Sequence, residues 1–110
     1  MDATAAPRHD RLFPAGTLRE PPTALARAGV VVLTRSDQVA PEDLARLRAE
    51  VAADTGRAPA EAVHVPAAVR AWSGGEVRGL DAVRGRRGFA FCGIGNPEAF
   101  RRTLASIGAT

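Results

Sequence analysis

The stretch that decides the fold is "VVVLTR" (Val30–Arg35), followed by "SDQVAPEDLARLRAEVAADTG" (Ser36–Gly56). The first part is an unbroken apolar run rich in β-branched residues, which is typical of a strand covered on both faces in a parallel sheet. In the second part Leu44, Leu47 and Val51 recur at helical spacing, and a proline and a glycine bound the helix. A buried strand followed by an amphipathic helix predicts an α/β fold.

The chain before this stretch is poor in regular structure. Residues 1–22 contain several prolines, which leave few options for a helix or a strand. Thr23 then fits the N-cap of a short helix that Gly29 closes. The sequence therefore predicts a long loop and a short helix ahead of the buried strand.

The chain after the helix alternates between short apolar runs and glycines. "AVHVPA" (62–67) predicts a short strand. "AVRAWS" (68–73) and "EVRGL" (76–80) alternate in polarity around a glycine pair, a pattern that indicates a hairpin. This part of the chain predicts a short β-ribbon.

A second buried strand is predicted in "FAFCGIG" (Phe89–Gly95), followed by a helix over Pro97–Ile107. Asn96 fits the N-cap of this helix. A strand, a glycine loop and a helix N-terminus form the arrangement in which many proteins hold a phosphate. Gly93, Gly95 and Asn96 are therefore candidate nucleotide-binding residues.

A purely structural corner is the alternative for this glycine segment. The phosphate loop G-x-x-x-x-G-K-[ST] is absent from the chain, which contains no lysine, and the dinucleotide pattern G-x-G-x-x-G lacks its third glycine. Pro97 also removes one backbone donor from the start of the helix. The residues alone leave both interpretations open.

Composition bounds the class of protein. The 110 residues suffice for one small domain, and a hydrophobic content of 45% is ordinary for a globular chain. The formal net charge is +3, yet the arginines are scattered and only 5% of residues are aromatic, so we expect no nucleic-acid partner.

No apolar run is long enough to cross a bilayer, and no signal peptide is visible. Cys92 is the single cysteine, which excludes an intrachain disulfide and predicts a small buried core residue.

The two histidines give weak signals. His9 and Asp10 form a pair in a proline-rich loop, which is more typical of a surface than of a catalytic site. His64 lies between two valines and is expected to be an edge or core residue. No second histidine stands at metal-ligand spacing from either one. We therefore predict neither a metal site nor a nucleophile–base pair.

The loop "RLFPAGTLREPP" (Arg11–Pro22) is a stronger candidate. Proline and glycine restrict its shape, and such a loop can present Arg19 as a planar fork for a phosphate or a carboxylate. The alternative is that Arg19 and Glu20 form ordinary surface ion pairs. The residues alone leave both interpretations open.

Two long motifs give the sequence a resemblance to a known family. "DRLFPAGTLREPPTALARAGVVVLTRSD" (Asp10–Asp37) resembles a segment of the tetraacyldisaccharide 4'-kinases, with their loop of the kind G-x-x-L-P-x-G-x-L-R-E-P. "FCGIGNPEAFRRTL" (Phe91–Leu104) resembles a later segment of the same family. Asp2 takes the place of the acid that ends the preceding strand in the family. The resemblance runs from about Asp2 to the end of the chain.

The resemblance implies the function. Enzymes of this family phosphorylate the disaccharide precursor of lipid A with ATP and Mg²⁺, at the cytoplasmic face of the bacterial inner membrane. The implied fold is a P-loop-kinase-like parallel sheet, here with a short β-ribbon. Arg19 is then the residue expected to bind the anionic lipid disaccharide, and the glycine corner lies beside the active cleft.

The resemblance also implies that parts of the enzyme lie outside the chain. The family's phosphate loop, its "DDGFQH" segment and its membrane-binding segment precede the matching region, and a histidine motif follows it. We therefore expect residues 1–40 to form the end of the kinase core and residues 41–110 a C-terminal α/β portion. Together they would make an incomplete domain that is inactive on its own and marginally stable.

Two other classes of function compete with the kinase. A non-catalytic Rossmann-like module that binds a nucleotide or a sugar phosphate would use the glycine corner Gly93–Asn96. A basic nucleic-acid binder would show strong, salt-dependent retention of DNA or RNA. Saturable nucleotide binding centred on Gly93–Asn96 would favour the first of these.

Overall fold

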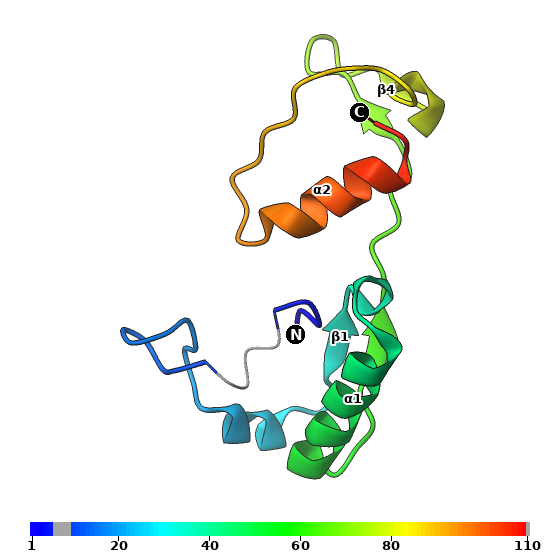
Figure 1. The fold of residues 1–110 in the computed structure, drawn as a ribbon. Helices are drawn as coiled ribbons and strands as arrows, with labels where there is room; N and C mark the ends of the chain where they lie inside the picture. The colour runs from blue at the N-terminus through cyan, green and yellow to red at the C-terminus, as the bar shows by residue number, and fades with distance from the viewer. Residues whose placement is uncertain (6–9, 110) are drawn as a thin grey trace. The chain divides into compact units, whose positions relative to one another are not determined.

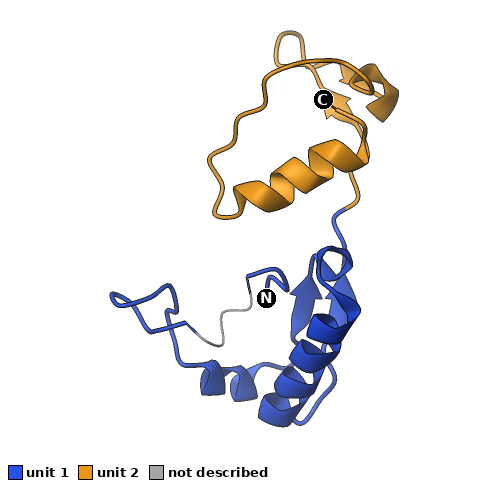
Figure 2. Cartoon of the chain, in the orientation of Figure 1, with its two compact units in different colours: residues 1–64 blue, residues 65–110 orange. Residues whose placement is uncertain are grey.

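The computed structural model describes residues 1–5 and 10–109, and these form two compact units (Figures 1 and 2). The first unit comprises Met1–His64 and the second Val65–Thr110. The first holds the parallel strands and the longer helix, and the second holds the hairpin and the last helix (Figure 2).

The first unit is built on strand β1 (Val32–Thr34), which pairs in parallel with β2 (Ala60–Ala62). The N-terminal residues pair with the other edge of β1. The amino group of Met1 donates to the carbonyl oxygen of Val32 at 2.7 Å, and the N–H of Thr34 donates to the carbonyl oxygen of Met1 at 2.9 Å. Strand β1 therefore has a parallel neighbour on each side, as the apolar run predicts.

Helix α1 (Pro41–Thr55) joins β1 to β2 (Figure 1) and supplies two of the four residues of the buried core cluster in the first unit. Leu47 and Val51 project from it into a buried cluster with Ala3 and Leu33. Leu33 is the fully buried residue of β1, with 0% of its surface exposed. The predicted burial of this strand on both faces is confirmed for Leu33 alone, since the neighbouring valines are partly or largely exposed.

The ends of α1 follow from its sequence. Pro41 occupies the first turn, where its missing N–H has no partner to lose, and Glu42 and Asp43 face the positive end of the helix dipole. Gly56 ends the helix in the left-handed conformation (φ 69°), and its N–H donates to the carbonyl oxygen of Ala52 at 2.8 Å. The predicted helix is confirmed at both ends.

The short helix before β1 differs from its prediction. It is a 3₁₀ helix, η2 (Pro22–Arg27), with Pro21 as the N-cap and no side-chain capping bond. The prediction that Thr23 caps it is wrong, because the two prolines start the helix earlier and place the N-cap two residues before Thr23. Gly29 lies just beyond the C-cap residue, Ala28. A second short 3₁₀ helix, η3 (Ser36–Gln38), follows β1.

The second unit begins with a two-stranded antiparallel ribbon, β3 (Val69–Arg70) and β4 (Val77–Arg78). The turn between the strands contains Gly74 at φ 87° and Gly75 at φ 66°. Residues that carry a side chain rarely adopt this backbone conformation. The predicted hairpin is thus confirmed. A 3₁₀ turn, η4 (Leu80–Ala82), follows it.

Helix α2 (Pro97–Ser106) completes the second unit. Its N-cap is Asn96, whose Oδ1 accepts a hydrogen bond from the N–H of Ala99 at 3.0 Å. Gly108 follows the helix with φ 76°. The last helix therefore starts at the predicted cap, and its regular turns end one residue before the predicted Ile107.

The segment "FAFCGIG" does not form the predicted buried strand. Residues 88–95 carry no strand assignment, and the side chains of Phe89 and Phe91 are 105% and 94% exposed. Strand hydrogen bonds require a neighbouring edge, and no described residue offers one to this segment. For the same reason Cys92 is exposed, which corrects the prediction of a buried core thiol.

The strand predicted at 62–67 lies earlier than expected. Strand β2 covers Ala60–Ala62, while Val63 and Val65 are exposed. The pairing with β1 sets these bounds, because Val32, the first residue of β1, faces Ala60. His64 is likewise exposed.

The architecture is mixed α/β, with one small parallel sheet and one small antiparallel sheet. The boundary between the two compact units falls after His64, because the β1–β2 pairing ties residues 41–64 to the preceding part of the chain. The division of the enzyme after residue 40, predicted from the sequence, stays a prediction.

Candidate functional site

The loop that follows Asp10 is held by the carboxylate of that residue. Asp10 Oδ1 accepts a hydrogen bond from the N–H of Arg11 at 2.7 Å, and Oδ2 accepts one from the N–H of Thr17 at 2.7 Å. The hydroxyl of Thr17 also donates to Oδ2. Hydrogen bonds from Thr17, and then from Arg11, hold the pKa of the Asp10 carboxyl below its ordinary value.

Backbone hydrogen bonds fix the inside of the loop. The N–H of Phe13 donates to the carbonyl oxygen of Leu18 at 2.8 Å, and the N–H of Leu18 donates to that of Arg11 at 3.1 Å. Gly16 packs so closely that an added Cβ would overlap the Arg11 carbonyl oxygen and the Asp10 carboxylate. The loop therefore has one defined shape that requires glycine at this position.

Arg19 stands at the end of this loop and is exposed. Its guanidinium carbon lies 5.4 Å from the centroid of the Phe13 ring, within the range of a cation–π contact. Glu20 pairs instead with Arg27 and raises the pKa of that guanidinium above its ordinary value. The alternative of ordinary surface ion pairs therefore holds for Glu20, which pairs with Arg27, whereas Arg19 contacts the Phe13 ring.

An apolar cavity of about 500 Å³ adjoins the loop. Leu18 and Glu20 line it from the loop, and η2 supplies Pro22, Leu25 and Arg27. The lining is mostly apolar, with the Glu20–Arg27 pair as its charged part. The hollow is therefore lined by the neighbours of Arg19 in the sequence, Leu18 and Glu20, rather than by Arg19 itself.

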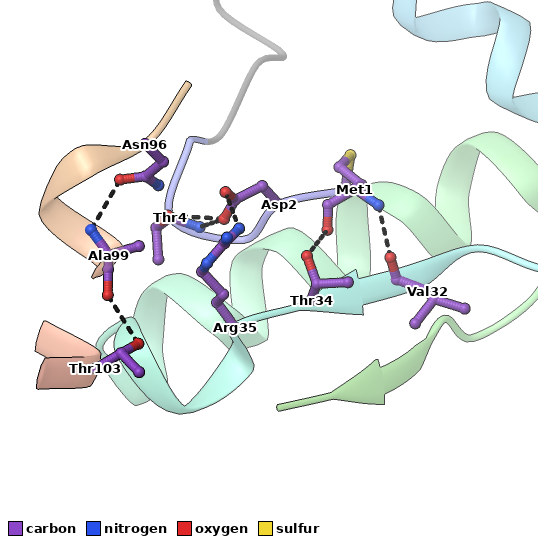
Figure 3. Close-up of polar contacts among 9 residues, drawn as sticks. All are labelled: Met1, Asp2, Thr4, Val32, Thr34, Arg35, Asn96, Ala99 and Thr103. Atoms are coloured by element: carbon purple, nitrogen blue, oxygen red, sulfur yellow. Dashed lines mark hydrogen bonds and ion pairs between the residues drawn. The ribbon is translucent and has the colours of Figure 1, made fainter. Parts of the chain in front are cut away.

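A second polar cluster lies where β1 and its N-terminal neighbour end (Figure 3). The Asp2 carboxylate pairs with the Arg35 guanidinium at 2.5 Å and accepts hydrogen bonds from the N–H and the hydroxyl of Thr4 at 3.0 and 2.7 Å. Arg35 is the non-glycine residue with positive φ (57°) in the described chain. Because ligands in α/β proteins often bind at the carboxyl edge of parallel strands, this cluster is a candidate for a binding site.

In the second unit, the candidate residues Gly93 and Gly95 border α2. An added Cβ at either glycine would meet open space, and neither has positive φ. Asn96 uses its Oδ1 to cap the N–H of Ala99, as Figure 3 shows. The backbone here does not itself require the two glycines, and one helix N–H is already bonded within the protein.

The first turn of α2 carries a negative side chain. Glu98 forms an ion pair with Arg101 at 2.7 Å and another with Arg102 at 3.5 Å. The hydrogen bond from Arg101 is the main reason that the pKa of Glu98 lies below its ordinary value. The carboxylate therefore stays ionised at neutral pH, beside the corner where a phosphate would have to bind.

The other candidates add no metal site. Within residues 1–5 and 10–109, no three histidine, cysteine or acidic side chains gather as metal ligands would. His9 lies outside the described residues, and His64 and Cys92 are exposed.

Arg19 belongs to the first unit, and Gly93, Gly95 and Asn96 belong to the second. Sequence reasoning missed two features of the first unit: the role of Asp10 as the acceptor that shapes the loop, and the Asp2–Arg35 pair. The spacing of an acid and a threonine seven residues apart around a proline and a glycine was a usable signal for the first. The second joins residues 33 positions apart, and no local pattern reports it.

Comparison with known proteins gives one consistent family. The profile of the family described as "Tetraacyldisaccharide-1-P 4'-kinase" matches residues 1–110. A tetraacyldisaccharide 4'-kinase of Anaeromyxobacter dehalogenans (strain 2CP-C) is 45% identical over 109 residues, which cover 99% of this chain and 29% of that protein. The protein of the same name from Geobacter metallireducens is 42% identical over 109 residues, which cover 98% of this chain and 29% of that protein.

No solved structure gives a significant match to the chain. The chain spans 29% of the length of the first curated relatives that it matches. The matches give no support to a separate Rossmann-like binding module. With its profile match over all 110 residues, the chain belongs to the tetraacyldisaccharide-1-P 4'-kinase family.

Proposed function

We propose that the intact protein containing this chain is a tetraacyldisaccharide 4'-kinase of lipid A biosynthesis. It would transfer the γ-phosphoryl group of ATP to the 4'-hydroxyl of a tetraacyldisaccharide 1-phosphate. The observation that carries this proposal is the family match over all 110 residues, together with relatives of one name at up to 45% identity. Because the chain spans 29% of those relatives, the activity is proposed for the intact protein.

The proposed fold is a P-loop-kinase-like parallel sheet. The strand–helix–strand unit from β1 through α1 to β2, with residues 1–3 on the other edge, supports it. When bound, ATP would supply the phosphoryl group, and Mg²⁺ would neutralise charge on its phosphates. The part of the chain that the structure describes holds no cluster of three metal-ligating side chains.

We propose that Arg19 binds the anionic head of the lipid substrate. A guanidinium offers a planar set of donors that matches a phosphate, and an exposed position leaves it accessible. Contact with Phe13 at 5.4 Å restricts where the guanidinium can lie. Arg19 would therefore orient the substrate and leave the chemical step to other residues.

We further propose that Gly93, Gly95 and Asn96 form a corner beside the nucleotide cleft of the intact enzyme. The open space around both glycines would let a ligand approach the backbone closely. The capping bond of Asn96 would keep the start of α2 fixed. The ionised Glu98 argues against direct phosphate binding here, so the proposed role is one of shape.

The substrate also suggests where the intact enzyme works. A tetraacylated disaccharide lies in a membrane, so we propose that the enzyme acts at the cytoplasmic face of the bacterial inner membrane. In the described part of this chain, no helix combines the length and the apolar character needed to span a bilayer.

The proposal is tested by assaying the intact gene product for ATP-dependent phosphorylation of tetraacyldisaccharide 1-phosphate. We expect a product with one added phosphate, detected by mass spectrometry, and no turnover by the 110-residue chain alone. An intact protein that leaves this lipid unmodified would contradict the proposed function. Rapid turnover by the isolated chain would contradict the expectation that essential parts lie elsewhere.

The role of Arg19 has its own test in the intact enzyme. We expect Arg19→Ala to lower kcat/KM for the lipid by about tenfold to a hundredfold, because a hydrogen bond to a charged group contributes about 1.5–3 kcal/mol. The KM for ATP should change little. Arg87→Ala is the matched control, since Arg87 is an exposed arginine outside the loop. Equal kinetics for Arg19→Ala and Arg87→Ala would remove Arg19 from the site.

A further inference from the structure

The loop that presents Arg19 is closed by one carboxylate. The Asp10 carboxylate accepts a hydrogen bond from the N–H of Arg11, the first residue of the loop. It also accepts hydrogen bonds from the N–H and the hydroxyl of Thr17, on the far side of the loop. We name this set of contacts between Asp10 and Thr17 the clasp. It joins residues seven positions apart, and both side chains are exposed, so these bonds must hold against competing water.

The clasp controls the position of Phe13 through the backbone. Thr17 is followed directly by Leu18, whose carbonyl oxygen accepts from the N–H of Phe13 at 2.8 Å and whose N–H donates to Arg11 at 3.1 Å. Phe13 is in turn the aromatic ring 5.4 Å from the Arg19 guanidinium carbon. A loop opened at Thr17 would therefore release both the arginine and the ring on which it rests.

Close packing supports the same conclusion. Gly16 lies directly against the clasp, with no room for a Cβ beside the Asp10 carboxylate. The pKa of Asp10 is lowered chiefly by its hydrogen bond from the Thr17 hydroxyl, so the carboxylate is charged at neutral pH and remains an acceptor. The hydrogen bonds of both side chains join residues within Asp10–Thr17, so we expect both residues to act through Arg19.

We propose that Asp10 and Thr17 are positioning residues that hold the Arg11–Arg19 loop in the shape that aims Arg19 at the anionic group of the lipid substrate. This proposal rests on the proposed kinase function. It assigns the clasp a share of substrate affinity and no part in the chemical step. Preorganisation of this kind lowers the entropy that binding must remove from the loop.

The test compares Thr17→Val with Thr17→Ser in the intact enzyme. Valine keeps the shape and the backbone N–H but lacks the hydroxyl, whereas serine keeps the hydroxyl. We expect Thr17→Val to raise the KM for the lipid about fivefold, with kcat and the KM for ATP unchanged, and Thr17→Ser to match the parent. Thr23→Val is the matched control, because Thr23 is exposed and its hydroxyl makes no hydrogen bond within the described residues.

A double-mutant cycle separates positioning from general stability. In an Arg19→Ala background we expect Thr17→Val to have no further effect on the KM for the lipid, since the clasp acts through Arg19. The same fivefold rise in both backgrounds would overturn the proposal. An unchanged KM for the lipid in Thr17→Val alone would overturn it as well.

Limited trypsin digestion keeps the clasp testable apart from the kinase assay. Opening of the loop should speed cleavage after Arg11 and after Arg19 in Thr17→Val, several-fold relative to the parent and to Thr23→Val. If the intact protein phosphorylates no tetraacyldisaccharide, the proposed function fails, and faster cleavage still supports the clasp as the element that orders the loop. Cleavage rates equal to the parent would overturn the clasp itself.

Discussion

At the scale of single residues, Arg35 combines a strained backbone conformation with a side chain that forms an ion pair. Its φ of 57° places it in the left-handed region, which costs a non-glycine residue about 1–2 kcal/mol. Its guanidinium pairs with Asp2 in a half-buried setting, where each side chain keeps about a quarter of its surface exposed. The ion pair and the bend that follows β1 therefore depend on the same residue.

Substitution separates these two contributions. Arg35→Ala loses the ion pair and keeps the strained backbone, whereas Arg35→Gly loses the ion pair but adopts positive φ freely. We expect both variants to lower the free energy of unfolding, and Arg35→Gly to be the more stable of the two by about 1 kcal/mol. Urea denaturation of both proteins measures the difference. An alanine variant as stable as the glycine variant would show that the backbone at Arg35 is not strained.

At the scale of elements, the two α-helices differ in how they are held. Helix α1 buries Leu47 and Val51 in the core of the first unit, so tertiary packing stabilises it. Helix α2 fully buries Ala99 alone and relies more on local features: its cap, its first-turn acid and its arginines. Local features matter most where packing is sparse.

The cap of α2 gives a prediction at this scale. Asn96→Ala removes the acceptor for the N–H of Ala99, which should destabilise the helix by about 1 kcal/mol. Asn96→Asp retains a side-chain oxygen at the same place and should keep most of the stability. Hydrogen exchange at the amide of Ala99 reports the loss directly. Exchange as slow in Asn96→Ala as in the parent would mean that the cap does not stabilise α2.

The elements also show which parts of the fold can be predicted from the sequence. Helix α1, the hairpin and the start of α2 were predicted because caps, glycines and periodicity are local signals. The strand at residues 88–95 was not found in the structure, because a strand exists only with a partner edge and apolar character cannot supply one. Arg19 could be predicted as a candidate from its loop, but its contact with Phe13 and the acceptor role of Asp10 depend on the three-dimensional shape of that loop.

At the scale of the whole molecule, large apolar side chains stay in contact with solvent. Trp72, Phe89 and Phe91 are almost fully exposed. Beside residues 88–90, an apolar hollow of about 290 Å³ is lined by Val69, Leu104 and Ile107. Exposed aromatic groups next to such a hollow favour association of protein molecules.

We therefore expect the isolated 110-residue chain to associate with itself at high concentration, and the double variant Phe89→Ser, Phe91→Ser to do so less. Sedimentation velocity over a range of concentrations measures this. Val65→Ser is the control, because Val65 is an exposed apolar residue away from the aromatic segment. Equal association of the double variant and the control would show that the two phenylalanines do not drive it.

The pairing around β1 also has a consequence for the speed of folding. Its neighbour on one side lies 31 residues earlier in the chain, and on the other side Val32 faces Ala60. A helix such as α1 forms within about a microsecond from local contacts, whereas parallel pairing must first close long loops. The closure of strands around β1, rather than the formation of α1, should therefore limit how fast the first unit acquires its structure.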